Sequence, residues 1–254
     1  MSFTLFRNPF PSFIEHYDEV SSTNDIAFEI LFEKGKKANG GIIVAENQSN
    51  GRGRIGRKWV SKMGDSLLLS LIFIPPENYF KEFIPLCAGL SVIRSIKKYR
   101  EIDAKLKWPN DIVFDGKKLG GILVESKTMG TTPSGFVIGI GLNVKGKKDD
   151  FSLELRNKVS TIEEISKREC DKNELLKFLI KELKEIYNFS FSDKMLFMVE
   201  LKREFIHRKG DRIKINLGNE ILEGNFVEIN DEGRMVINSK KGKRVIIHGE
   251  VESL

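Results

Sequence analysis

A basic, glycine-rich stretch at residues 48–59 constrains the fold of this chain more than any other feature. It reads QSNGRGRIGRKW and alternates glycine with arginine. Glycine lets the backbone approach a ligand closely and adopt positive φ, and arginine presents a charged, planar set of donors that suits carboxylate or phosphate. Apolar, β-favouring runs at 41–46 and 66–73 flank the stretch. We therefore expect an anion-binding loop between two buried strands.

The loop alone leaves two other interpretations open. Alternating arginine and glycine are also typical of RNA-binding segments, and a charged loop is often simply solvated. A non-enzymatic nucleic-acid binder would need aromatic residues interleaved for base stacking, and the loop offers only Trp59.

Hydrophobic periodicity predicts the elements around the loop. We expect strands at 13–17, 104–107, 112–114, 122–125 and 136–144, and helices at 26–34, 81–99, 175–189 and 195–205. The polar residues 22–24 precede the first helix, where they can cap it or face a small ligand. Glycines at 120–121, and Gly139, Gly141 and Asn143 on one face of a strand, leave open space against the backbone.

The last fifty residues have a different pattern. Short alternating strands are expected at 212–216, 221–229, 234–238 and 244–248, separated by turn residues. This spacing predicts a small β-barrel, with a domain boundary near residues 204–210.

Composition excludes several classes of protein. No apolar run approaches the roughly 20 residues that span a bilayer, and the first ten residues lack a signal-peptide pattern, so we expect a cytoplasmic protein. Cys87 and Cys170 are far apart and the three histidines are scattered, which indicates buried thiols rather than a zinc site, a disulfide framework or a Ser-His-Asp group. The net charge of +6 suggests an anionic substrate or an acidic partner.

Four blocks follow one another in the order SSTN, QSNGRGRIGRKW, KWPNDIVFDGKKLGGILVES and IGIGLN. Together they resemble a biotin protein ligase of the monofunctional type that lacks the N-terminal helix-turn-helix. The resemblance implies an α+β fold: a class II aminoacyl-tRNA synthetase/biotin ligase-like mixed sheet flanked by helices, with a small C-terminal β-barrel. The implied domains are a catalytic biotin- and ATP-binding domain at 1–206 and the barrel at 207–254.

The resemblance also implies a two-step reaction. Biotin and ATP give biotinyl-5′-adenylate and pyrophosphate, and a lysine of a biotin carboxyl carrier protein domain, in acetyl-CoA carboxylase or a similar enzyme, then takes the biotinyl group. The expected cofactors are ATP, biotin and Mg²⁺. No DNA or membrane partner is expected, and because homodimers occur among relatives, a homodimer is one expected assembly.

Residue roles are carried over by matching positions. The residues expected to bind the biotin head group by hydrogen bonds are Ser22, Thr23, Asn24 and Gln48. Those expected to hold the biotin carboxylate, the adenylate phosphate and the loop are Arg52, Gly53 and Arg54, with Trp59 as an aromatic wall near the adenine.

The third and fourth blocks supply the remaining roles. Lys107 would neutralise ATP phosphates, Asn110 and Asp111 would position Mg²⁺ or the acceptor lysine, and Lys118 would bind the carboxyl end of biotin and the phosphoryl oxygens. Gly121, Gly139 and Gly141 would leave room for the ligand, and Asn143 would contact the nucleotide. The expected catalytic residues are Arg54, Lys107, Asp111 and Lys118. Catalysis would rest on positioning and on cationic stabilisation of the transferring phosphoryl group.

The nearest alternative is a lipoate or octanoate protein ligase of the same fold. The blocks GRGRIGRKW and KWPND favour biotin over this alternative. One departure is small: Gly120 is often alanine in relatives, and we expect that difference to affect packing more than chemistry.

Overall fold

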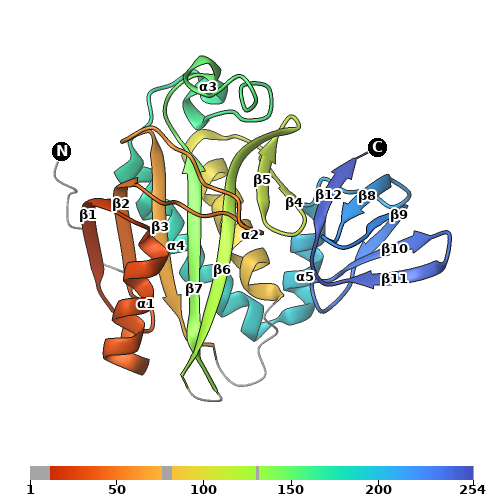
Figure 1. Cartoon of the computed structure of the whole chain (residues 1–254), viewed down its shortest axis with the longest axis horizontal. Helices are drawn as coiled ribbons and strands as arrows, with labels where there is room; N and C mark the ends of the chain where they lie inside the picture. The colour runs from red at the N-terminus through yellow and green to blue at the C-terminus, as the bar shows by residue number, and fades with distance from the viewer. Residues whose placement is uncertain (1–11, 76–81, 130–131, 254) are drawn as a thin grey trace.

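The structure is a computed structural model that describes residues 12–75, 82–129 and 132–253. It contains a seven-stranded sheet of order β1-β2-β3-β7-β6-β5-β4 and a five-stranded sheet of order β11-β10-β9-β8-β12 (Figure 1). The strands of the first sheet are β1 Ile14–Val20, β2 Ile42–Gln48, β3 Ser66–Phe73, β4 Lys105–Lys107, β5 Asp111–Phe114, β6 Lys117–Met129 and β7 Thr132–Asn143. Because β1 pairs in parallel with β2 and the other neighbours are antiparallel, the expected mixed sheet is confirmed.

Helices cover both faces of this sheet, as strand alternation requires. Ile43, Ile72 and Val137 face α1 (Thr23–Lys34) in one apolar cluster. Their sequence neighbours point the other way, into the main core with α2 (Phe83–Arg100) and α4 (Lys172–Ser192). Gly139 and Gly141 lie on the face that carries α1, because a Cβ added to Gly139 would meet Asn24 in the first turn of that helix.

The C-terminal strands form an antiparallel sheet beside the first one. They are β8 Arg212–Asn216, β9 Ile221–Ile229, β10 Met235–Ser239, β11 Gly242–Ile246 and β12 Glu250–Ser253. In the described part of the chain the hydrogen-bonded ladder is open, with β11 and β12 at its edges. It follows α5 (Lys194–Arg203), and Trp108 joins the two sheets by donating from Nε1 to the Gly233 carbonyl at 3.1 Å.

Strand β6 begins at Lys117, five residues before the expected start at 122. Asp115 and Gly116 both have positive φ (47° and 72°), which closes a tight hairpin directly before Lys117. A register shift between Ile112 and Val113 lets both glycines, Gly120 and Gly121, stay in the ladder.

Two short elements were absent from the expectations: β12 and the helix α3 (Ile162–Ser166). The 3-10 turns η1 (Gly35–Ala38) and η2 (Lys148–Asp150) complete the elements. The expected helix start at Lys81, and the first ten residues, lie outside the described part of the chain. Cys87 and Cys170 are buried free thiols, as expected. Within the described residues, no helix combines the length and apolarity that crossing a membrane requires.

Candidate active site

A cavity of about 500 Å³ opens between the start of α1, the basic loop, the strands β6 and β7, and the start of β12. The residues singled out from the sequence that line it are Ser22, Thr23, Asn24, Gln48, Arg52, Gly53, Arg54, Trp59, Lys107, Asn110, Asp111, Lys118, Gly121, Gly139 and Gly141. Four blocks that are separated along the chain therefore meet around one space.

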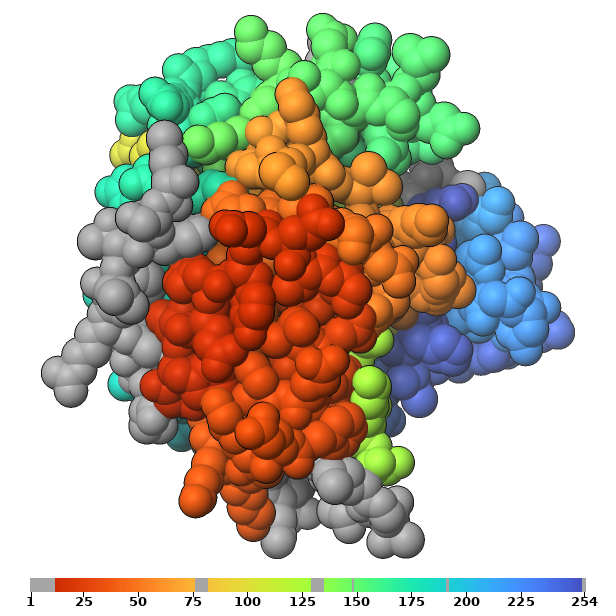
Figure 2. Space-filling view, turned by 60° about the vertical axis from the view of Figure 1, so that its left-hand side comes forward, coloured from red at the N-terminus to blue at the C-terminus, as the bar shows by residue number. Residues whose placement is uncertain are grey.

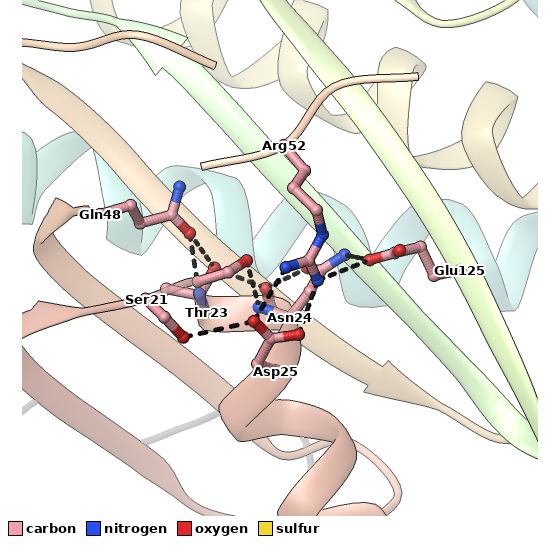
Figure 3. Close-up of polar contacts among 9 residues, drawn as sticks. Ser21, Thr23, Asn24, Asp25, Gln48, Arg52 and Glu125 are labelled. Atoms are coloured by element: carbon pink, nitrogen blue, oxygen red, sulfur yellow. Dashed lines mark hydrogen bonds and ion pairs between the residues drawn. The ribbon is translucent and has the colours of Figure 1, made fainter. Parts of the chain in front are cut away.

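The inner end of the cavity is polar and tightly hydrogen-bonded (Figure 3). Ser22 caps α1 by accepting from the Asn24 backbone N–H at 3.3 Å. Thr23 donates from its backbone N and from Oγ1 to Gln48 Oε1, at 2.8 and 3.0 Å. Ser70 Oγ lies 2.7 Å from Thr23 Oγ1 and 2.5 Å from Asn24 Oδ1. Amide and hydroxyl groups are thus fixed where a small polar ring could be bound.

Arg52 turns toward the walls of the cavity instead of its centre. Its two terminal nitrogens donate to the Asp25 carboxylate at 2.8 and 2.7 Å, and Glu125 lies 3.5 Å away (Figure 3). The hydrogen bond from Arg52 lowers the pKa of Asp25, and the same contact raises the pKa of Arg52. In this arrangement the guanidinium expected to hold an anion is already paired with carboxylates.

The floor of the cavity is built from glycines against which Trp59 packs. A Cβ added to Gly141 would lie 2.7 Å from the Trp59 ring, and one added to Gly139 would lie 2.6 Å from Asn24 Oδ1. A side chain larger than hydrogen at either position would displace a residue of the candidate site.

The outer end of the cavity is cationic. Lys118 Nζ forms an ion pair with Asp111 at 2.7 Å, and Arg54 donates to Asn110 Oδ1 at 3.0 Å and lies 3.4 Å from the Gly249 carbonyl. In the part of the chain that the structure describes, Lys107 has no ion-pair partner. Burial lowers the pKa of Arg54, while the charges of Asp111 and Glu250 oppose that shift. These cations can bind a negatively charged group that enters from the open side.

Asn143 is the one candidate that lies outside this cavity. It is 5% exposed and borders a second, smaller cavity of about 260 Å³, together with Val60, Phe151 and Leu155. Its Nδ2 is 3.4 Å from the Lys118 carbonyl oxygen, so the two cavities are neighbours.

Several lining residues were not expected from the sequence. Arg57 and Lys58 lie in the basic loop but had no assigned role. Lys158 lies at the cavity because its neighbour Val159 forms an isolated β-bridge with Lys118, a contact that no local sequence pattern indicates. Gly249 directly precedes β12, and Glu250, Val251 and Glu252 are its first three residues. Arg57 forms an ion pair with Glu250. In Figure 2, the orange segment that follows the red N-terminal part of the chain lies against the blue C-terminal residues.

A comparison with protein families matches residues 17–143 to the Biotin/lipoate A/B protein ligase family. The chain belongs to this family. The matched segment contains the polar, glycine and cationic parts of the cavity, and the C-terminal sheet lies beyond it.

Individual relatives are consistent with this membership. The chain is 28% identical over 238 residues to the bifunctional ligase/repressor BirA of Bacillus spizizenii, covering 93% of this chain and 73% of the relative. It is 27% identical over 248 residues to the biotin–[acetyl-CoA-carboxylase] ligase of Mycobacterium tuberculosis, covering 93% and 88%. The biotin protein ligase from Aquifex aeolicus in complex with biotin and ATP superposes with a TM-score of 0.80 at 28% identity, over 96% of this chain and 98% of that one.

Proposed function

We propose that this member of the family is a biotin protein ligase, which activates biotin with ATP and transfers the biotinyl group to a lysine of an acceptor protein. The observation that carries the choice of substrate is the polar inner end of the cavity, which Thr23, Asn24 and Gln48 line and the buried Ser70 supports from behind. The ring of biotin carries two N–H donors and a carbonyl acceptor, which such groups can satisfy. The dithiolane ring of lipoate has no such groups and cannot form hydrogen bonds with this end of the cavity, which disfavours the alternative.

The two ends of the cavity fit the two ends of the ligand. With the ring at the inner end, the carboxylate of biotin points toward Lys118 and Arg54. In the first step the carboxylate oxygen attacks the α-phosphorus of ATP, an acyl–phosphate bond forms, and pyrophosphate leaves. Arg54, Lys107 and Lys118 neutralise charge on the transferring group, which requires Lys118 to exchange its contact with Asp111 for a phosphoryl oxygen.

In the second step the amine of the acceptor lysine attacks the acyl carbon and AMP leaves. Asp111 is the carboxylate of the cationic end, and once Lys118 has moved it can accept a hydrogen bond from the incoming amine. Neither step needs a nucleophile of the enzyme, and the site works by positioning and electrostatics.

The base of ATP fits the second cavity. Val60, Phe151 and Leu155 give this cavity apolar side chains, and the amide of Asn143 adds a donor and an acceptor. The cavity adjoins Lys118, because Asn143 Nδ2 lies 3.4 Å from the Lys118 carbonyl oxygen. This supports the expected nucleotide role of Asn143. Trp59 packs on the glycine floor of the main cavity, and its expected place near the adenine stays a prediction.

Magnesium fits as a companion of ATP. Mg²⁺ is usually held by one or two carboxylates together with substrate phosphates. Asp111 supplies such a carboxylate at the cationic end. Within the described residues, no group of three or more His, Cys, Asp or Glu could hold a metal ion alone. Bound there with ATP, Mg²⁺ would offset phosphate charge.

The acceptor, the location and the assembly are further parts of the proposal. We infer that the acceptor is a lysine of a biotin carboxyl carrier protein domain, which a biotinylation assay with such a domain would test. Two buried free thiols and the use of ATP support a cytoplasmic location. A homodimer stays a prediction for sedimentation analysis.

The first test is biotin-dependent exchange of labelled pyrophosphate into ATP, with lipoate and octanoate in parallel. We expect exchange with biotin alone. Exchange with lipoate instead would move the chain to the other branch of the family, and exchange with no acid would refute the ligase reaction.

The matched variants for this test are Lys118→Ala and Arg54→Ala. Each removes a cation from the transferring phosphoryl group, so we expect exchange to fall by about 100-fold or more while the fold is retained. Unchanged turnover in either variant, with an unchanged circular dichroism spectrum, would contradict the assignment of that residue.

A further inference from the structure

Arg52 connects the basic loop to two walls of the cavity. Its planar fork meets Asp25 in the first turn of α1 at 2.7 and 2.8 Å, and one nitrogen lies 3.5 Å from Glu125 of β6. A bidentate arginine–carboxylate pair fixes direction as well as distance. The start of the loop is therefore tied to both elements that border the inner end of the cavity (Figure 3).

Glu125 makes a second contact, with Asn24. Its Oε2 accepts from Asn24 Nδ2 at 2.6 Å, and Asn24 Oδ1 faces Ser70 Oγ at 2.5 Å. An ionised carboxylate can only accept, so this contact determines which end of the amide is nitrogen. The absent side chain of Gly139 provides the space that the amide occupies.

We propose that Asp25 and Glu125 are positioning residues: together they hold Arg52 as a strut that pins the start of the basic loop, and Glu125 links this strut to the amide of Asn24. The part of this inference that concerns biotin rests on the proposed function. Arg52 then fixes the loop, and phosphate binding falls to the cations at the outer end of the cavity, Arg54, Lys107 and Lys118.

The two carboxylates have separable tasks. Asp25 contacts the strut and Ser21, whose Oγ donates to its carboxylate at 3.3 Å, whereas Glu125 contacts the strut and the ring-binding amide. Replacing Glu125 by Gln keeps an oxygen that can accept from Asn24 but removes the charge that attracts Arg52. Replacing it by Ala removes both.

The strut is tested without any ligand, by limited trypsin digestion. The loop contains cleavage sites after Arg52, Arg54, Arg57 and Lys58. We expect Asp25→Asn, Glu125→Gln and Glu125→Ala each to be cleaved in the loop several times faster than wild type, with fragment masses identifying the sites. The matched control is Glu223→Gln, which removes a carboxylate that contacts Arg212 in the C-terminal sheet at 3.3 Å. Loop cleavage at the wild-type rate in all three variants would overturn the strut.

The link to Asn24 is tested by pyrophosphate exchange. We expect Glu125→Ala to raise KM for biotin on the order of tenfold, because a hydrogen bond to a charged group is lost, while KM for ATP and the thermal midpoint stay near wild type. Glu125→Gln and Asp25→Asn should stay within about threefold of the wild-type KM for biotin, because Asn24 keeps its acceptor. Equal KM values in Glu125→Ala and Glu125→Gln would overturn the link.

The two experiments, trypsin digestion and pyrophosphate exchange, distinguish failure of this inference from failure of the proposed function. A wild-type protein without biotin-dependent exchange would refute the ligase reaction and, with it, the link to biotin. Trypsin digestion would still show whether Asp25 and Glu125 hold Arg52 and the basic loop in place. A wild-type protein with normal exchange, and variants that match it in both experiments, would refute the positioning role alone.

Discussion

His207 is a buried histidine at the junction of the two sheets, 4% exposed and in ring contact with Phe226. Burial, helped by the nearby charge of Lys107, lowers the pKa of His207 from 6.5 to about 4. A histidine with a lowered pKa stabilises the fold while it is neutral. Its contribution is complete above the unfolded pKa of 6.5 and is lost as the pH falls from 6.5 toward 4.

We therefore predict that the free energy of unfolding declines between pH 6.5 and pH 4, with a contribution from this residue of at most about 3 kcal/mol. His207→Phe keeps the aromatic contact and cannot titrate, so it should show a shallower decline. Urea unfolding at closely spaced pH values measures both slopes. Parallel curves for the two proteins would show that His207 is not responsible.

At the residue scale, spacing was informative where candidate residues lie on consecutive paired strands. Lys107, Asp111 and Lys118 follow one another across the β4–β5–β6 connections, and the cavity contains all three. The pairing of Arg52 with two carboxylates could not be predicted from the sequence. Its partner Asp25 is 27 residues away, and Glu125 reaches it only after the sheet has formed. A basic loop in a sequence shows which cations are present, and the fold decides which of them are already paired.

Strands β6 and β7 carry glycines with different surroundings on opposite faces. A Cβ added to Gly120 would lie 2.4 Å from Leu142 Cδ2 and 2.8 Å from the Gly141 carbonyl oxygen, inside the core. A Cβ added to Gly139 would instead meet the amide of Asn24 at the cavity. Glycines of one ladder therefore border the core on one face of the sheet and the candidate site on the other.

We predict that Gly120→Ala lowers the free energy of unfolding by about 1–3 kcal/mol and leaves KM for biotin near wild type, because the added carbon overpacks the core. Gly139→Ala should raise KM for biotin at least about tenfold with a smaller loss of stability, because Asn24 must move. Urea unfolding and pyrophosphate exchange on both variants give the comparison. If Gly120→Ala were the variant with the impaired KM, the assignment of the two faces would be wrong.

The clarity of the local pattern decided which elements could be predicted. Strand β3 was expected at 66–73 and is found as Ser66–Phe73, because an apolar run interrupted only by Ser70 suits a strand buried on both faces. Strand β12 was missed, since four residues alternating acidic with other side chains resemble a polar terminus. Its pairing with β8 places it at the cavity, and that pairing is a property of the assembled sheet.

At the scale of the whole molecule, the larger of the two apolar clusters in the described residues is a core shared by both sheets, from Ile42 and Leu106 to Ile213 and Met235. Further contacts cross the same junction. The backbone N of Leu106 donates to the Glu204 carbonyl at 2.7 Å, and Arg234 forms an ion pair with Glu82 at 3.1 Å. The predicted division at residues 206 and 207 therefore falls in a segment that is packed against the first sheet, and the two parts should depend on each other for stability.

We predict that the two sheets unfold together. Trp108 is 2% exposed and donates to Gly233 across the junction, and Trp59→Phe leaves it as the only tryptophan, so its fluorescence reports on the contact between the sheets. In urea, the fluorescence of this variant and its circular dichroism at 222 nm should change with the same midpoint, because a shared core is lost in one step. A fluorescence change that precedes the loss of circular dichroism would mean that the C-terminal sheet separates first, and the cavity would then lose its wall at β12 before the rest of the site unfolds.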